Sequence, residues 1–240
     1  MIFPSDIANG VPLVFSQASR SLLRPTLREP CSPYMTNAAR EITQLSESLW
    51  IWQFYDTSVK AELCATALKT SAGILFVDPV PLDDGPLQAL TRNVSIAGVF
   101  VTNVNHCRAA NDFSEKFSCP AFAQAATHAE CSFSFPQTVS DAEMFCGDAR
   151  TIEIPGGPTG ETAIYHARDG GSLIVGDALI NFEPYGFAFL PKKYCTNEKQ
   201  MRRSFRRLVD YDFERMLFAH GTPIMQSARK KLEQLLRDSD

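Results

Sequence analysis

Apolar and polar residues alternate in the first part of the chain that shows a clear pattern, and this period of two predicts β-strands. Segments 41–55 and 62–70 both follow it. A turn then leads into the short apolar run 74–77, which ends at Asp78-Pro79. These three segments predict an antiparallel meander whose first strand carries an aromatic face.

Strands and helices alternate through the rest of the chain. Helical periodicity and cap residues predict helices at 84–92, 108–117, 197–209 and 226–236. Short apolar runs bounded by turn residues predict strands at 99–101, 121–125, 151–154, 162–167, 173–175 and 215–219, with a loop at 139–147. This order predicts two mixed sheets packed face to face with helices outside, which is a four-layer αββα sandwich of the α/β (α+β) class.

The N-terminal residues 1–39 lack a clear period and are rich in proline. Phe3, Leu13 and Phe15 would stay exposed if this segment were a disordered tail. We therefore expect an irregular arm that packs on the body of the protein or on a second subunit of a homodimer. Residues 40–240 are predicted to form one domain.

The charge balance argues against two classes of partner. The 240 residues carry 27 acidic and 23 basic side chains, a net charge of −4, and 45% of residues are hydrophobic. Such a balance does not favour binding to nucleic acid or to a membrane surface. The N-terminus, with Asp6 and no basic start, does not resemble a signal peptide. We expect a cytoplasmic protein with a large core.

The basic segment 202–207, RRSFRR, is predicted to be a solvated helix face. Asp210, Asp212 and Glu214 follow it directly and offset its charge.

Seven cysteines occur without a C-x-x-C pair, and their number is odd. This pattern argues against a disulfide framework or a zinc ribbon. Most of the cysteines are therefore expected to be small buried residues in a reducing compartment. Cys107 alone lies in a segment where a thiolate would matter.

That segment, VFVTNVNHCRAA at 99–110, is the strongest candidate for a functional site. Its strand is followed by Asn103, Asn105, Cys107 and Arg108. Loops beyond the carboxyl ends of strands are where side chains converge in layered α/β proteins. In an extended chain His106 would point to the opposite side from Asn105, so we expect it to face away and to have a packing or capping role.

Several local patterns, taken in order, resemble the metallo-β-lactamase superfamily. ILFVDP is similar to its second core strand and ends near Asp78, and 99–110 falls where the family has T-H-x-H-x-D-H. PGGPTGETAIY falls where it has P-G-H-T-P-G-S. SLIVGDALI, with Asp177, and MLFAHGTPI, with His220, resemble two later motifs. The resemblance covers residues 40–237 and implies the same αββα fold.

In active members these motifs hold two metals, usually zinc, that activate a bridging water for hydrolysis. The resemblance implies substitutions at most of the metal-binding positions. They are Asn103 and Asn105 for the first two histidines, Cys107 for the aspartate, Arg108 for the third histidine and Gly157 for the histidine of P-G-H-T. Asp177 and His220 keep the family's residue types. An amide oxygen is a poor zinc ligand and an arginine is none, so the two-metal site is expected to be largely lost.

The favoured interpretation is a divergent member of this hydrolase superfamily, of unknown substrate, that keeps small-ligand binding in the old pocket. Near the start of the following helix, Arg108 with Asn103 or Asn105 would bind an anionic group, beside Asp78. Alternatively, Arg108 forms a salt bridge to Asp177 or Asp78 that replaces the lost metal charge.

Three alternatives remain open, and with them whether the protein is an enzyme. In the first, one zinc ion at Cys107, Asp177 and His220 hydrolyses an ester, thioester or lactone, with these residues as the catalytic candidates. In the second, Cys107 and His220 form a nucleophile pair. In the third, the protein is non-catalytic and binds a partner through the arm and the aromatic face. The sequence indicates no cofactor other than this candidate zinc ion.

Overall fold

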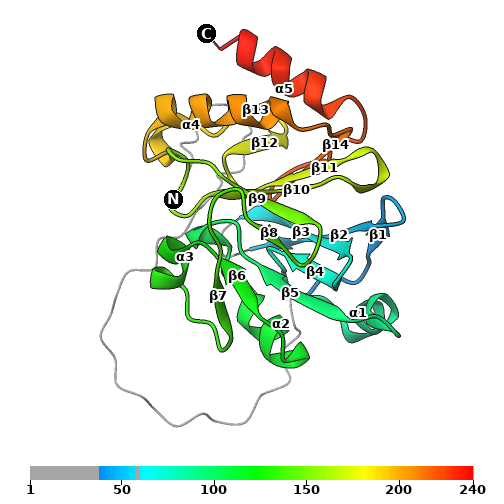
Figure 1. The fold of residues 1–240 in the computed structure, drawn as a ribbon. Coiled ribbons are helices and arrows are strands. Elements are labelled where there is room, and N and C mark those ends of the chain that lie inside the picture. Colours follow the sequence, from blue (N-terminus) through cyan, green and yellow to red (C-terminus); the bar gives the residue numbers. More distant parts are fainter. Residues whose placement is uncertain (1–37, 58–59, 240) are drawn as a thin grey trace.

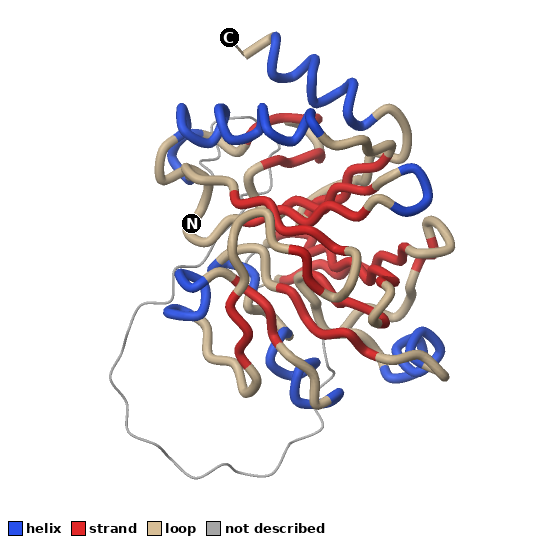
Figure 2. The backbone as a smooth tube through the Cα atoms, viewed as in Figure 1, coloured by secondary structure: helices blue, strands red, loops and turns tan. Residues whose placement is uncertain are grey.

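The computed structural model describes residues 38–57 and 60–239. Two mixed β-sheets pack face to face, and helices cover the outer face of each (Figures 1 and 2). The predicted four-layer α/β sandwich is confirmed. Almost all of the predicted arm, and with it the predicted homodimer contact, lies outside the described residues. Within them, no helix is both long enough and apolar enough to cross a membrane.

The first sheet has seven strands, which lie in the order of the sequence. They are β1 (Thr43–Gln44), β2 (Leu49–Asp56), β3 (Ala61–Thr70), β4 (Gly73–Val77), β5 (Ile96–Phe100), β6 (Ala121–Ala123) and β7 (Pro136–Thr138). Strands β1 to β4 are antiparallel, as the meander predicts, and β4 to β7 are parallel. The parallel strands are connected through the helices α1 (Asp84–Thr91), α2 (Ala110–Phe117) and α3 (Ala125–Glu130).

The second sheet has five strands in the order β14-β11-β10-β9-β8. Their bounds are β8 (Met144–Phe145), β9 (Ala149–Glu153), β10 (Thr162–His166), β11 (Ser172–Val175) and β14 (Arg215–Phe218). A separate hairpin consists of β12 (Leu179–Phe182) and β13 (Gly186–Phe189). Helices α4 (Glu198–Phe205) and α5 (Ala228–Arg237), with the 3₁₀ segment η4 (Arg206–Asp210), lie above this sheet in Figure 1.

Three apolar layers hold the four structural layers together. Between the sheets, Leu75 and Phe100 of the first sheet pack with Ile164 and Leu217 of the second. Two further layers lie between each sheet and its helices. Each fully buried side chain of this size contributes about 1.5–3 kcal/mol through removal from water. Side chains alternate between the two faces of a strand, so each sheet contributes apolar residues both to the layer between the sheets and to the layer under its helices.

The structure differs from the predicted elements mainly in short segments. The predicted strand 41–55 is broken by a turn at which Leu45 N donates to Leu49 O. Helix α3, strand β7 and the hairpin β12–β13 were not predicted, and β8 lies within the predicted loop 139–147. These elements have two to six residues, too few to show a clear period.

The carboxyl ends of strands from both sheets meet at one edge of the sandwich. Asp78 follows β4, and the loop 101–109 follows β5. Asp177 and His220 follow β11 and β14 in the other sheet. The chain order thus brings the candidate residues together from two sheets.

Candidate functional site

His106 lies at the centre of a buried network of charged residues. It ends the 3₁₀ turn η1 (Val104–His106), which starts where the Asn103 side chain accepts a hydrogen bond of 2.8 Å from the Asn105 backbone N–H. His106 is 1% exposed. Its Nδ1 lies 2.8 Å from Asp78 Oδ2 and its Nε2 lies 3.0 Å from Asp177 Oδ1. The expectation that His106 faces away is wrong, because the chain turns here instead of remaining extended.

Asp78 is held by two further donors. The backbone N–H of Thr102 donates to Oδ1 at 2.8 Å, and the Thr102 hydroxyl donates to Oδ2 at 2.7 Å. Burial alone would raise the pKa of Asp78, but His106, the charge of Arg108 and the Thr102 hydrogen bond together outweigh it and hold the pKa below its usual value. The backbone of Asp78 has a φ of +48°, a region that non-glycine residues rarely adopt. The surrounding contacts thus hold this carboxylate ionised and in a strained backbone conformation.

The charge of His106 follows from its two carboxylate neighbours. Burial and the nearby Arg108 guanidinium lower the pKa of His106, but Asp177 and Asp78 outweigh both and raise it to about 9. His106 is therefore a buried imidazolium between two carboxylates. His106, together with a second histidine, His220, holds the pKa of Asp177 well below its usual value, against the effect of burial.

A second histidine faces the same carboxylate oxygen. His220 Nε2 lies 3.4 Å from Asp177 Oδ1, and His220 Nδ1 donates to the carbonyl oxygen of Glu62 at 2.9 Å. Burial lowers the pKa of His220. Asp177 Oδ1 thus lies between the Nε2 atoms of two buried histidines.

Arg108 stands beside this network without contacting its carboxylates. Its guanidinium donates to the carbonyl oxygens of Cys64 at 2.9 Å and Asp78 at 3.4 Å, and lies 3.4 Å from His220 Nε2. The expected salt bridge to Asp177 or Asp78 is absent from the described residues. His106 is instead the cation that contacts both carboxylates.

Glu161 is a member of the network that the sequence did not single out. It is 2% exposed, and it accepts hydrogen bonds from Asn103 Nδ2 at 2.7 Å and from Ala178 N at 3.2 Å. Burial and the negative charge of Asp177 raise the pKa of Glu161 to about 8. Glu161 falls where the family pattern P-G-H-T-P-G-S has its serine, and this substitution was the one sign in the sequence that residue 161 belongs to the site.

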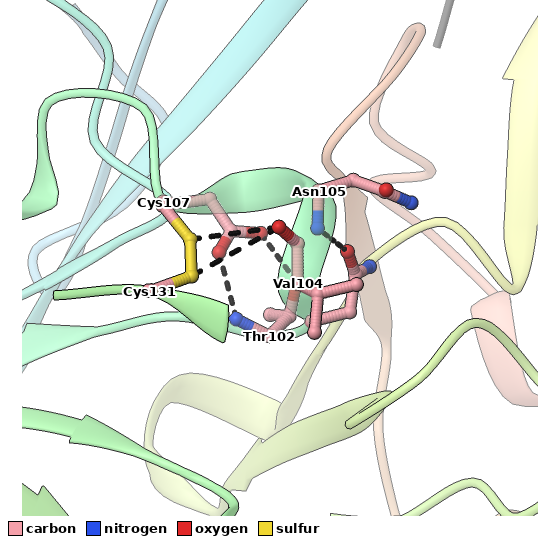
Figure 3. Close-up of a disulfide and its surroundings, with 7 residues drawn as sticks. Thr102, Val104, Asn105, Cys107 and Cys131 are labelled. Atoms are coloured by element: carbon pink, nitrogen blue, oxygen red, sulfur yellow. Dashed lines mark hydrogen bonds between the residues drawn. A yellow bond between two sulfur atoms is a disulfide. The ribbon is translucent and has the colours of Figure 1, made fainter. Parts of the chain in front are cut away.

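Cys107 does not have the role expected for it. It forms a disulfide with Cys131, which joins the loop after β5 to the end of α3 (Figure 3). The two sulfur atoms lie 3.5 and 3.9 Å from the carbonyl oxygen of Val104. Cys107 therefore supplies no thiolate in this structure, either to a zinc ion with Asp177 and His220 or as a nucleophile beside His220. At Cys107 and Cys131, the expectation of small reduced cysteines is also wrong.

A cavity of about 200 Å³ opens beside the network. It is lined by Val104, Asn105, Pro158, Thr159, Asp177, Leu190, Lys193, Tyr194, Cys195 and Thr196. Asn105 donates to Asp177 Oδ2 at 2.9 Å, at the base of the cavity. Of the four residues predicted to bind a ligand, only Asn105 is among these lining residues; Asn103, Arg108 and Asp78 are not.

The positions that would bind the first metal are occupied by other contacts. Asn103 is fully buried and donates to Glu161. A Cβ atom at Gly157 would lie 3.1 Å from both Cβ and Cγ of Glu161. A side chain at residue 157 therefore competes with Glu161 for the same space.

A set of three donors for one cation does fit. One ligand atom from each of His106, Asp177 and His220 lies within 4.8 Å of the other two. Both histidines hold their Nδ1 atoms on oxygen acceptors, an arrangement usual for histidines that bind a metal through Nε2. His106 replaces Cys107 in the predicted set.

The family model of the metallo-beta-lactamase superfamily matches residues 44–238. The chain belongs to this superfamily. A search of curated proteins found no match.

Solved structures of the superfamily share the fold at low sequence identity. DIM-1 metallo-beta-lactamase has 12% identity and a TM-score of 0.65, covering 85% of this chain and 99% of its own. A metallo-beta-lactamase from Pontibacter korlensis has 16% identity and a TM-score of 0.63, with 82% and 99% coverage. A metallo-beta-lactamase family protein from Thermus thermophilus has 19% identity and a TM-score of 0.59, with 82% and 80% coverage.

Proposed function

We propose that this superfamily member has lost the two-metal centre and binds a small hydroxycarboxylate in the cavity beside Asp177. The observation that carries the proposal is the contact of His106 with both Asp78 and Asp177. Buried carboxylates need compensating positive charge. His106 and Arg108 provide two positive charges for these two carboxylates from the chain itself.

The chemistry of the cavity lining favours a small ligand with two different ends. Lys193 is exposed at the lining and offers a positive charge to an anionic group. Asp177, at the base of the cavity, accepts hydrogen bonds and repels anions. A ligand with a carboxylate near Lys193 and a hydroxyl donor near Asp177 would complement both side chains. The cavity of about 200 Å³ limits such a ligand to a small molecule.

The test is thermal stabilisation by L-malate and lactate at constant ionic strength, with acetate as the anion that lacks the hydroxyl. A ligand that binds only the folded protein raises its melting temperature. We expect malate or lactate to stabilise the wild type more than acetate does, and Lys193→Gln to abolish this effect. Lys192→Gln is the matched control, because Lys192 is exposed and adjacent but does not line the cavity. Equal stabilisation of the two variants, or no stabilisation of the wild type, contradicts the proposal.

A second candidate function follows from the convergence of His106, Asp177 and His220. These residues would hold one zinc ion, which when bound supplies a Lewis acid and an activated water for hydrolysis. Asp78 and the Glu62 carbonyl oxygen would orient the two histidines through Nδ1. Arg108 opposes this function, because a guanidinium 3.4 Å from His220 Nε2 repels a cation there.

Elemental analysis separates the two functions. The untagged protein is dialysed against zinc and then against metal-free buffer. The metal-free proposal predicts that far less than one zinc per chain remains, in the wild type and in His220→Ala alike. About one zinc per chain that is lost in His220→Ala makes the single-zinc hydrolase the leading function.

A further inference from the structure

A second cavity, separate from the network around Asp177, lies between α4 and α5. Its volume is about 520 Å³. It is lined by Phe189, Lys199, Arg202, Arg203, Arg206, Leu236 and Ser239. Among the lining residues that the structure describes, four are cations and none is a carboxylate.

The four cations lie along one face of the helical segment that runs from α4 into η4. Lys199, Arg202, Arg203 and Arg206 follow the spacing i, i+3, i+4 and i+7, which places side chains on the same face of a helix. Like charges at this spacing destabilise a helix. Glu198 offsets part of this repulsion through its ion pair with Arg202 at 2.7 Å.

Arg202 is held in place at the cavity wall. Its guanidinium donates to Glu198 at 2.7 Å and to the carbonyl oxygen of Ser239 at 3.2 Å. It also lies over the ring of Phe189, with 5.3 Å between the guanidinium carbon and the ring centroid. These contacts engage Arg202, so it forms part of the cavity wall and leaves contact with a ligand to the other three cations.

Phe189 and Leu236 add an apolar surface to this basic wall. Both are largely buried, with 9% and 8% exposure. Arginine forks match the oxygens of phosphate groups in paired hydrogen bonds, and the apolar side chains fit a hydrocarbon or aromatic group. The combination therefore suits an anion that has both parts.

We infer that this cavity binds the phosphate group of a small organic phosphate ester, with Lys199, Arg203 and Arg206 contacting the phosphate and Phe189 and Leu236 contacting the organic part. The site is independent of the function proposed for the cavity beside Asp177. It also replaces the expectation that segment 202–207 is only a solvated face. A cavity of limited volume on a chain of net charge −4 favours a small ligand over nucleic acid.

The experiment is isothermal titration calorimetry with phenyl phosphate and with inorganic phosphate, at constant ionic strength. Both probes carry the same phosphate chemistry, but only phenyl phosphate has a ring to contact Phe189 and Leu236. We expect phenyl phosphate to bind more tightly than inorganic phosphate. The double variant Lys199→Gln/Arg203→Gln should weaken binding of phenyl phosphate by at least about tenfold.

Arg207→Gln is the matched control. Arg207 is an exposed arginine of the same segment, but it pairs with Asp141 at 2.7 Å and does not line the cavity. Its variant should bind phenyl phosphate like the wild type. The proposal is overturned if the wild type binds no phenyl phosphate at about 10 mM, if inorganic phosphate binds equally well, or if Arg207→Gln weakens binding as much as the double variant. If the protein binds a single-stranded oligonucleotide but not phenyl phosphate, the proposed phosphate-ester site is instead a surface for nucleic acid.

Discussion

His106 Nε2 and Asp177 Oδ1 form a contact of 3.0 Å that joins the two halves of the sandwich. His106 follows β5 of the seven-stranded sheet, and Asp177 follows β11 of the five-stranded sheet. Because His106 also contacts Asp78 after β4, one imidazolium links three strand ends. The network therefore stabilises the alignment of the sheets as well as forming the base of a cavity.

Removal of His106 should be strongly destabilising. His106→Ala leaves Asp78 and Asp177 buried without the cation that contacts both, which costs about 3–5 kcal/mol. Urea unfolding of the wild type and the variant measures the difference. His128→Ala serves as the control, because His128 packs edge-on to Phe133 and takes no part in the network. A loss for His106→Ala no larger than the loss for His128→Ala would show that the network does not depend on His106.

Gly157 and Glu161 should be energetically coupled, because a Cβ at residue 157 meets Glu161 at 3.1 Å. We expect Gly157→Ala to destabilise the wild type by about 1–3 kcal/mol through overpacking. In the Glu161→Gly background, which lacks both the Cβ and the Cγ that the new methyl group meets, the same change should cost less by at least about 0.5 kcal/mol. A double-mutant cycle by urea unfolding gives this coupling free energy. Gly85→Ala is the control, because a Cβ at Gly85 meets no atom within 4 Å. Additive effects of Gly157→Ala and Glu161→Gly would argue against the competition for space.

Reduction of the Cys107–Cys131 disulfide should lower stability. The bridge closes a loop over a sequence separation of 24 residues, which is expected to contribute about 3 kcal/mol. Urea unfolding with and without dithiothreitol measures this contribution. Cys131→Ser should remove the response to the reductant, whereas Cys195→Ser should retain it, because Cys195 is a free cysteine. Identical unfolding curves for the wild type in both buffers would contradict the prediction.

Acid should destabilise the protein in part through His166. Burial lowers the pKa of His166 below the ordinary value of 6.5, although Asp148 lies 3.5 Å from its Nε2. Below pH 6.5 the unfolded chain binds a proton that folded His166 does not, so the free energy of unfolding falls as the pH decreases. Urea unfolding from about pH 7.5 to about pH 5 should show a smaller decrease for His166→Gln than for the wild type. The same decrease in both proteins would assign the acid sensitivity to other groups.

The sequence predicted the layers of the fold because they depend on long apolar runs and on their order. The positions of Asp177 and His220 at strand ends followed from the same runs. His106 was misplaced because alternation holds only for an extended chain, and Asn103 caps a 3₁₀ turn there. Glu161 had only its place at the serine of a family motif as a signal, and the partner of Cys107 had none, since both contacts join residues distant in the sequence.

In the proposed metal-free form, the positive charges beside Asp78 and Asp177 belong to His106 and Arg108 and arrive with the polypeptide. A protein that relies on bound metal depends on the metal supply of its cell and can be loaded with a competing ion. Positive charges on side chains depend on neither the metal supply nor the presence of competing ions. The composition of this network is therefore fixed by translation, and a chelator should leave the melting temperature unchanged.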